Sequence, residues 1–312
     1  MQSEATDKLR AAETMHGRPA RHTPCSQCGN DATTPVFARH GFSYSRCNTC
    51  ALVRVDPQLT QHAIDAIYRG TYTEKSRAVV GPGKTQPKDI AILQTLARLC
   101  GSTGRLLEVG CFEGRLLWAA REAGWTVTGT EISEAAANYA SREQGLDVRV
   151  GRLEEMGFTA DAFDAVALVD VIEHLPDPRR TLEEIHRVLR PGGALYVWTP
   201  NFDSLTRRVA RQRWGAVIFP WHLYYFSPRT LVHMLAETGF STAEIITRNW
   251  LLDFRDRYAA LQSGEPLGQQ PKLIRRARRL IDIGSDPLFA WMDTHGRHLG
   301  AQIEIYASRN RS

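Results

Sequence analysis

The sequence contains no run of about 18 apolar residues, which is the length that a membrane-spanning helix needs. Its first segment, MQSEATDKLRAAETMHGR, also lacks the apolar core of a secretory signal. Internal repeats and low-complexity tracts are absent, which excludes a repeat architecture. These absences lead us to expect a cytoplasmic protein in a reducing compartment.

A strong excess of one charge is missing too. The 312 residues carry a net charge of +5, with 43% hydrophobic and 23% charged residues. This composition is typical of a globular chain with one large core and a small appendage. The mild basic excess fits an acidic partner but selects none. Residues 23–55 lack the dense Lys and Arg interleaved with aromatic residues that nucleic-acid modules carry, so we expect no DNA partner and leave RNA as an alternative.

Cysteine is scarce but organised. Four of the six cysteines form two Cys-x2-Cys pairs separated by 18 residues: Cys25, Cys28, Cys47 and Cys50. In a reducing compartment this spacing predicts a structural Zn²⁺ bound by four thiolates, and chance spacing of reduced thiols is the alternative. We expect a zinc ribbon at 23–57 after a disordered tail at 1–22. Cys100 stands apart, as a small core residue would.

After a connecting segment or substrate cap at 58–88, predicted strands and helices alternate. Apolar runs and helical periodicity indicate strands at 104–110, 125–132, 146–151, 163–171, 194–200, 243–249 and 301–308, and helices at 89–99, 114–124, 133–145, 181–193 and 228–238. This alternation predicts an α/β fold with a parallel sheet. Ser133 and Ser227 are the expected N-caps of two of the helices.

The first strand-to-helix turn, LLEVGCFEG, raises the question of a ligand. Gly110 and Gly114 let the backbone pass close to a bound molecule. Glu131 ends the next strand, where a carboxylate can accept the hydroxyls of a ribose. Glu113 would repel the pyrophosphate of a dinucleotide. The turn therefore predicts a nucleoside cofactor without phosphate.

Five segments in order resemble the class I S-adenosylmethionine-dependent methyltransferases: EVGCFEG, TGTE, GRLE, FDAVALVDVIEHLPDP and LRPGGALYV. The resemblance covers about residues 86–310 and implies a Rossmann-like, seven-stranded methyltransferase domain at 89–312, with a helical insertion at 251–300. The cofactor contacts that it implies are Glu108, Gly110, Cys111, Phe112, Gly114, Glu131, Ile132, Leu153, Glu154 and Asp170. Phe112 stands where the family usually has glycine. Arg152 stands where a carboxylate often meets the adenine amine, which leaves Glu154 or backbone groups for that contact.

Methyl transfer to an alcohol, phenol or acidic carbon also needs a group that takes a proton. The exit of the fourth strand offers Asp170, Glu173 and His174, and we expect His174 to be the base. His222, in the segment WHLYYFS, could be a second base or orient the first. The same residues resemble a divalent-metal site found in some methyltransferases, so a second ion is a further hypothesis. The alternative is that these side chains only pack the loops.

The acceptor is less clearly indicated. The Asn/Asp-Pro-Pro-aromatic run that is common in amino-methylating enzymes is absent at the strand-four exit. The ribbon, Tyr68, Tyr72 and Glu173-His174 are similar to parts of deoxysugar C-methyltransferases, and the core also resembles ubiquinone-type O-methyltransferases. We expect a small-molecule acceptor: a sugar, a polysaccharide precursor or a natural product, methylated on oxygen or carbon.

Two other functions stay open at this point. One is an RNA methyltransferase that uses the ribbon to bind RNA, and the other is a non-catalytic cofactor-binding or zinc scaffold. Residues 272–283 form a predicted helix with arginines on one face. That helix could touch a membrane surface, or it could be a solvated face over the core.

Overall fold

The computed structural model describes residues 24–39, 42–58, 64, 85–211, 214–218, 221–248 and 287–311. The predicted tail at 1–22, most of the segment at 58–88 with Tyr68 and Tyr72, and the predicted basic helix at 272–283 lie outside these residues. Only the last part of the predicted insertion at 251–300 falls within them. Among the described residues, none of the helices has the length and apolar content that crossing a bilayer requires.

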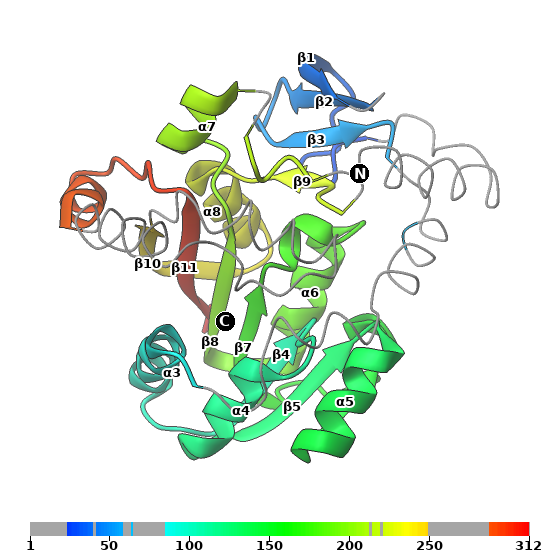
Figure 1. Ribbon diagram of the computed structural model, residues 1–312, viewed down its shortest axis with the longest axis vertical. Coiled ribbons are helices and arrows are strands. Elements are labelled where there is room, and N and C mark those ends of the chain that lie inside the picture. The colour runs from blue at the N-terminus through cyan, green and yellow to red at the C-terminus, as the bar shows by residue number, and fades with distance from the viewer. Residues whose placement is uncertain are drawn as a thin grey trace, which may run out of the picture.

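The chain forms a large sheet flanked by helices, with a smaller sheet at one end (Figure 1). The strands are β1 (Thr33–Arg39), β2 (Phe42–Cys47), β3 (Val53–Asp56), β4 (Arg105–Val109), β5 (Thr126–Glu131), β6 (Val148–Val150), β7 (Phe163–Val169), β8 (Leu189–Pro200), β9 (Tyr224–Tyr225), β10 (Phe240–Arg248) and β11 (Gln302–Arg309). The helices are α3 (Pro87–Cys100), α4 (Arg115–Glu122), α5 (Glu134–Gln144), α6 (Pro178–Val188), α7 (Leu205–Ala210) and α8 (Pro228–Glu237), with short 3₁₀ turns η2 (Leu153–Glu155) and η3 (Ile172–His174).

The large sheet has seven strands in the order β10-β11-β8-β7-β4-β5-β6. Its five strands from β8 to β6 run parallel, and β11 is antiparallel to both of its neighbours. This is the predicted Rossmann-like α/β fold class, which is confirmed. The carboxyl ends of β4, β5, β7 and β8 meet at one edge, where ligands bind in such sheets.

Helices cover both faces of this sheet, as the alternation of side chains along β7 shows. Val166 and Leu168 point to one side, in the core that contains residues of α6 and α8. Ala165 and Ala167 point to the other side, in the core with residues of α3, α4 and α5. Burial on both faces explains why the segment reads as a continuous apolar run.

The predicted caps are present, but several predicted boundaries are wrong: α6 begins at Pro178 rather than 181, and β10 begins at Phe240 rather than 243. The Ser133 and Ser227 side chains accept hydrogen bonds from backbone N–H groups of the first turns of α5 and α8. The helix predicted at 181–193, however, ends at Val188, and Leu189 already belongs to β8. Leu189 pairs with Phe163 of β7, and Pro191 disfavours a helical residue before it, so the chain extends earlier than the glycines indicated.

The smaller sheet has the order β1-β2-β3-β9, and β9 comes from a distant part of the chain. The backbone N–H of Val55 in β3 donates to the carbonyl of Leu223 (2.9 Å), just before β9. The N–H of Leu223 in turn donates to the carbonyl of Glu173 (2.8 Å). The cysteine-rich sheet is therefore hydrogen-bonded to the carboxyl edge of the large sheet.

Candidate active site and metal sites

The glycine turn folds back on β5. The N–H groups of Gly110 and Cys111 both donate to the carbonyl of Thr130, at 2.8 and 3.0 Å. Gly110 has a φ of +67°, and a Cβ there would lie 2.7 Å from a methyl carbon of Val171. Glycine thus lets the turn pack against the segment that follows β7. The predicted cofactor turn and the predicted catalytic segment are brought together by this contact.

Glu131 lies at the end of β5 and holds the turn with its side chain. One carboxylate oxygen accepts from the N–H of Phe112 (2.9 Å) and the other from the N–H of Ser133 (2.8 Å). The residue is 8% exposed, and burial raises its pKa although these N–H groups lower it. Each carboxylate oxygen has two lone pairs, so both can also accept from hydroxyls of a ligand.

Phe112 in the turn has a strained backbone, and Glu108 in the preceding strand β4 has a buried carboxylate. Phe112 adopts a φ of +52°, the left-handed conformation that glycine would take without cost. Glu108 in β4 is buried, and one of its carboxylate oxygens has no hydrogen-bond partner among the described residues. Burial raises the pKa of Glu108 to about 8, although nearby Arg115 lowers it. An orphaned buried carboxylate beside glycine turns fits a cofactor that carries a cationic amine.

The other predicted cofactor contacts lie along the same edge. Cys111 and Leu153 are buried, and Ile132 is half-buried beside Glu131. Glu154 accepts a hydrogen bond from the Thr181 hydroxyl of α6 (2.5 Å), so one of its oxygens is already engaged. Its contact with an adenine stays a prediction. Asp170 has a φ of +53° and follows β7 directly.

A second cluster follows β7 and meets the segment before β9. Ligand atoms of Glu173, His174 and His222 all lie within 4.8 Å of one another, and Asp170 is not part of this group. The rings of His174 and His222 are in edge contact at 4.6 Å between centroids. The prediction that His222 would join Glu173 and His174 therefore has a geometric basis, although the roles of these residues stay a prediction.

The hydrogen bonds of this cluster fix its chemical state. His174 Nδ1 lies 2.8 Å from the Trp221 carbonyl, which can only accept, so Nδ1 carries the hydrogen and Nε2 keeps a lone pair. Glu173 is 1% exposed; one oxygen accepts from the Thr199 hydroxyl (2.9 Å), and the other has no hydrogen-bond partner among the residues that the structure describes. Trp221 lies in the segment WHLYYFS that also contains His222, but the part played by its carbonyl, like that of the Thr199 hydroxyl, is not recognisable without the fold.

Burial dominates the electrostatics of the cluster. It raises the pKa of Glu173, with a further increase from the charge of Asp170. Burial also lowers the pKa of His174 to about 4, although the hydrogen bond to the Trp221 carbonyl raises it. The pKa of His222 is lowered well below its ordinary value, first by burial and then by the charge of His174. Two neutral imidazoles and a buried carboxylate with one oxygen unsatisfied fit a divalent cation chemically.

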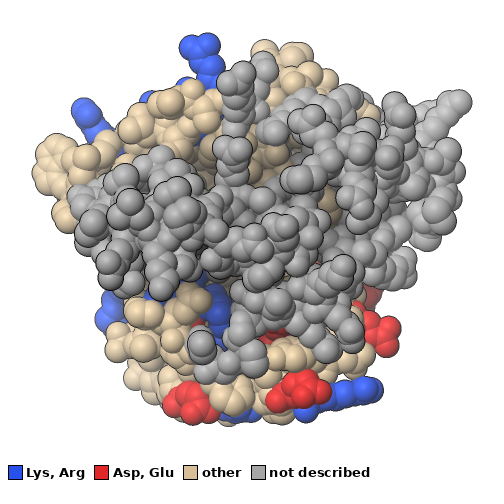
Figure 2. All heavy atoms as spheres, viewed as in Figure 1, with Lys and Arg blue, Asp and Glu red and all other residues tan. Residues whose placement is uncertain are grey.

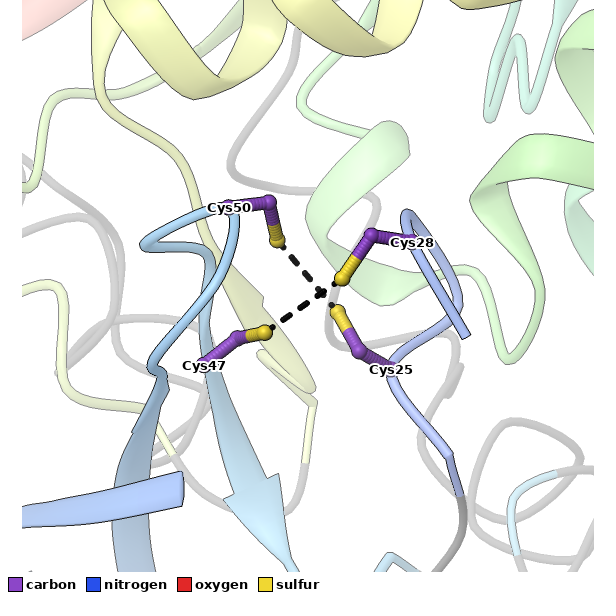
Figure 3. A group of neighbouring side chains, drawn as sticks. All are labelled: Cys25, Cys28, Cys47 and Cys50. Atoms are coloured by element: carbon purple, nitrogen blue, oxygen red, sulfur yellow. Dashed lines mark hydrogen bonds between the residues drawn. The ribbon is translucent and has the colours of Figure 1, made fainter. Parts of the chain in front are cut away.

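The four paired cysteines converge from two loops (Figure 3). Sulfur atoms of Cys25 and Cys50 lie 3.5 Å apart, as do those of Cys28 and Cys47, and all four lie within 4.8 Å of one another. These distances are too long for disulfide bonds. They are close to the sulfur–sulfur separation of about 3.8 Å in a tetrahedral zinc site with Zn–S bonds of about 2.3 Å. The cluster therefore fits one structural Zn²⁺ with no open position.

Comparison with known proteins identifies the family. The family described as "methyltransferase domain" matches residues 85–245, which is more than half of the chain. The protein therefore belongs to the methyltransferase-domain family, and the resemblance to S-adenosylmethionine-dependent methyltransferases is confirmed.

Individual relatives agree with this assignment. A probable S-adenosylmethionine-dependent methyltransferase of Mycolicibacterium smegmatis is 31% identical over 50% of this chain and 58% of its own length. A ubiquinone biosynthesis O-methyltransferase of Aromatoleum aromaticum is 30% identical over 49% of this chain and 71% of its own length. The chain thus spans only part of the length of these curated relatives.

A solved methyltransferase structure from Galdieria sulphuraria has 16% sequence identity and a TM-score of 0.50, covering 72% of this chain and 86% of its own. At this identity it supports the fold alone. The family supports S-adenosylmethionine as the cofactor, and the turn at Gly110 with Glu131 has the features expected to hold it.

Proposed function

We propose that the protein transfers the methyl group of S-adenosylmethionine to an oxygen of a small-molecule acceptor that binds against Glu173, His174 and His222. The observation that carries the proposal is the contact between Gly110 and Val171. It sets the cofactor turn directly beside the segment that leads into this cluster. The similarity to ubiquinone biosynthesis O-methyltransferases supports oxygen over carbon as the target.

The chain's own residues would prepare the acceptor in distinct ways. Thr199 orients the Glu173 carboxylate, and the Trp221 carbonyl holds the His174 ring, whose Nε2 lies 4.0 Å from a Glu173 oxygen. The His174 side chain keeps 22% of its surface exposed, which leaves an acceptor access to it.

Two roles for His174 follow from this arrangement. As a general base it would take the acceptor proton at Nε2, but a pKa of about 4 makes it a weak base at neutral pH. As a ligand it needs only the lone pair. We favour a divalent cation held by Glu173, His174 and His222, which would act as a Lewis acid toward an acceptor oxygen. In either role the methyl carbon and the acceptor atom must be aligned, so positioning supplies much of the rate.

The test begins with the acceptor. Labelled S-adenosylmethionine is incubated with the protein and an extract of its own cell, and the molecule that gains the methyl group is identified. Its turnover is then measured for wild type, His174→Ala, His222→Ala and the surface control His295→Ala. We expect the first two variants to lose about 10²–10⁴ in kcat with nearly unchanged cofactor affinity, and the control to match wild type.

A chelator separates the two roles. If a cation is held at this site, chelation should abolish turnover and added divalent ion should restore it while the zinc of the cysteine cluster stays bound. Turnover that survives chelation in wild type but not in His174→Ala would support the general-base role. Full turnover by His174→Ala and His222→Ala would refute both.

A further inference from the structure

Two arginines from separate parts of the fold converge on one aromatic ring. Phe202 follows β8 and is buried. The guanidinium carbon of Arg207 in α7 lies 4.1 Å from the centroid of its ring, and that of Arg46 in β2 lies 5.8 Å from it. Arg46 directly precedes the cysteine-cluster residue Cys47. The sheet that carries the cysteines therefore supplies one of these cations, and the segment after β8 supplies the other.

Neither charge has an ion-pair partner within 4.0 Å in the described part of the chain. No hydrogen bond or ion pair within 4.0 Å joins the side chain of Arg46 or Arg207 to a described residue, and the Nε of Arg207 is buried without a partner. Burial lowers the pKa of Arg207, and the charge of Arg46 lowers it further; Asp203 opposes this, and Arg208 adds a smaller decrease. Both side chains are half-buried. Because partial burial of a charge without a nearby counter-ion is unfavourable, this arrangement is better suited to a bound anion than to the free protein.

The side chains visible in Figure 2 agree in part with this placement. Blue basic side chains stand at the upper end, where Figure 1 places α7 and the smaller sheet, and others lie in the lower half. The red acidic side chains visible on this face lie in the lower half. Among the described side chains visible on this face, the upper end therefore shows basic groups without acidic ones, which favours an anion there.

A row of aromatic contacts links the arginines to the candidate active site. The Phe202 ring lies 6.0 Å from that of Tyr225, and Tyr225 lies 6.2 Å from the His222 ring. His222 contacts His174 at 4.6 Å. In addition, the N–H of Phe202 donates to the carbonyl of Phe226 (2.7 Å). Phe202, on which both arginines converge, thus lies three ring contacts away from His174.

We propose that Arg46 and Arg207 bind an oxyanion of the methyl acceptor, a phosphate ester or a carboxylate, while its reactive oxygen lies at Glu173, His174 and His222. A guanidinium that stacks on a ring keeps its N–H edge available, and that edge matches both groups in a two-point contact. The assignment rests on the proposed function, and it gives the cysteine-rich sheet a part in acceptor selection through Arg46.

The experiment uses the full zinc-loaded chain and two matched probes, phenyl phosphate and benzoate. Their affinities are measured by calorimetry for wild type, Arg46→Gln, Arg207→Gln and the control Arg142→Gln, an exposed arginine on α5. We expect at least one probe to bind wild type and the control equally, and each of the other two variants to bind it about tenfold or more weakly. The probe that binds tells whether the group is a phosphate or a carboxylate.

Three further measurements separate the explanations. Removing a charge that lacks a nearby counter-ion offsets the lost contact with Phe202, so the Tm of the probe-free variants should stay close to that of wild type. Variants that lose stability and still bind the probe would show that the arginines only hold the sheet in place, and this would overturn the proposal. Failure of both probes to bind wild type would overturn it too, as would variants that lose affinity for single-stranded RNA but not for the probes. Binding of S-adenosylmethionine is measured in parallel, so a failure of the proposed function appears as lost cofactor binding or methyl transfer while the anion result stays readable.

Discussion

Replacing Gly110 with alanine tests the contact that joins the predicted cofactor turn to the segment after β7. Alanine at a φ of +67° costs about 1–2 kcal/mol. Its Cβ would also lie 2.7 Å from a methyl carbon of Val171, and overpacking of this kind costs about 1–3 kcal/mol. We therefore expect Gly110→Ala to lower the free energy of unfolding by about 2–5 kcal/mol, measured by urea denaturation. It should also weaken binding of S-adenosylmethionine, measured by calorimetry.

A control and a second-site change separate the two costs. Gly157 has a φ of +61° with nothing within 4 Å of an added Cβ, so Gly157→Ala should show the backbone cost alone. Val171→Ala removes the methyl groups that the new Cβ would meet. In a double-mutant cycle, Val171→Ala should therefore recover the part of the lost stability that comes from the clash, while the part that comes from the backbone conformation of residue 110 remains. A Gly110→Ala variant no less stable than Gly157→Ala, or a cycle without coupling to Val171, would refute the contact.

Three other outcomes are expected. Glu131→Gln should weaken cofactor binding by about 1–3 kcal/mol in calorimetry, because the amide accepts fewer of the hydrogen bonds that the carboxylate takes; unchanged affinity would reject the ribose contact. Glu108 has a raised pKa of about 8 in the folded protein, so its contribution to stability is fully present at low pH and declines by about 1.4 kcal/mol per pH unit as pH rises from 5 to 8. Urea titrations of Glu108→Gln should lack this decline, and parallel curves for the two proteins would contradict the assignment. Metal analysis should find about one zinc per chain in wild type and in Cys100→Ser but none in Cys28→Ser, and an equal zinc content in all three would exclude the four-cysteine site.

The fold class was predictable because the apolar runs, the helix caps and the alternation of strands and helices all indicated the same α/β fold. The apolar runs of β4 and β7 are buried on both faces, and Ser133 and Ser227 cap the helices that they were expected to cap. Four cysteines in two close pairs also predict a single four-cysteine site, because each pair lies on one turn and the two turns can face each other. These features depend on local sequence or on the order of strands, and both are visible without coordinates.

The parts that could not be predicted depend on contacts between distant segments. β9 has only two residues, and it is a strand because β3 lies beside it. The state of His174 depends on the carbonyl of Trp221, 47 positions further along the chain, and that of Glu173 depends on the Thr199 hydroxyl. A histidine's tautomer and its shifted pKa are properties of such neighbours. The sequence could therefore indicate His174 as a candidate, but it could not decide between a base and a ligand.

The cysteine-rich sheet is more than an appendage, because its hydrogen bonds continue into the candidate active site. β3 pairs with β9, Val55 donates to Leu223, and Leu223 donates to the carbonyl of Glu173. His222 directly precedes Leu223. The backbone that carries the His222 and Glu173 side chains is therefore held on one side by β3. A structural zinc that keeps the cysteine loops together would thereby stabilise the position of Glu173 and His222 without taking part in the chemistry. The cofactor turn packs on β5 instead, so loss of the zinc should disturb the acceptor side of the site before the cofactor side.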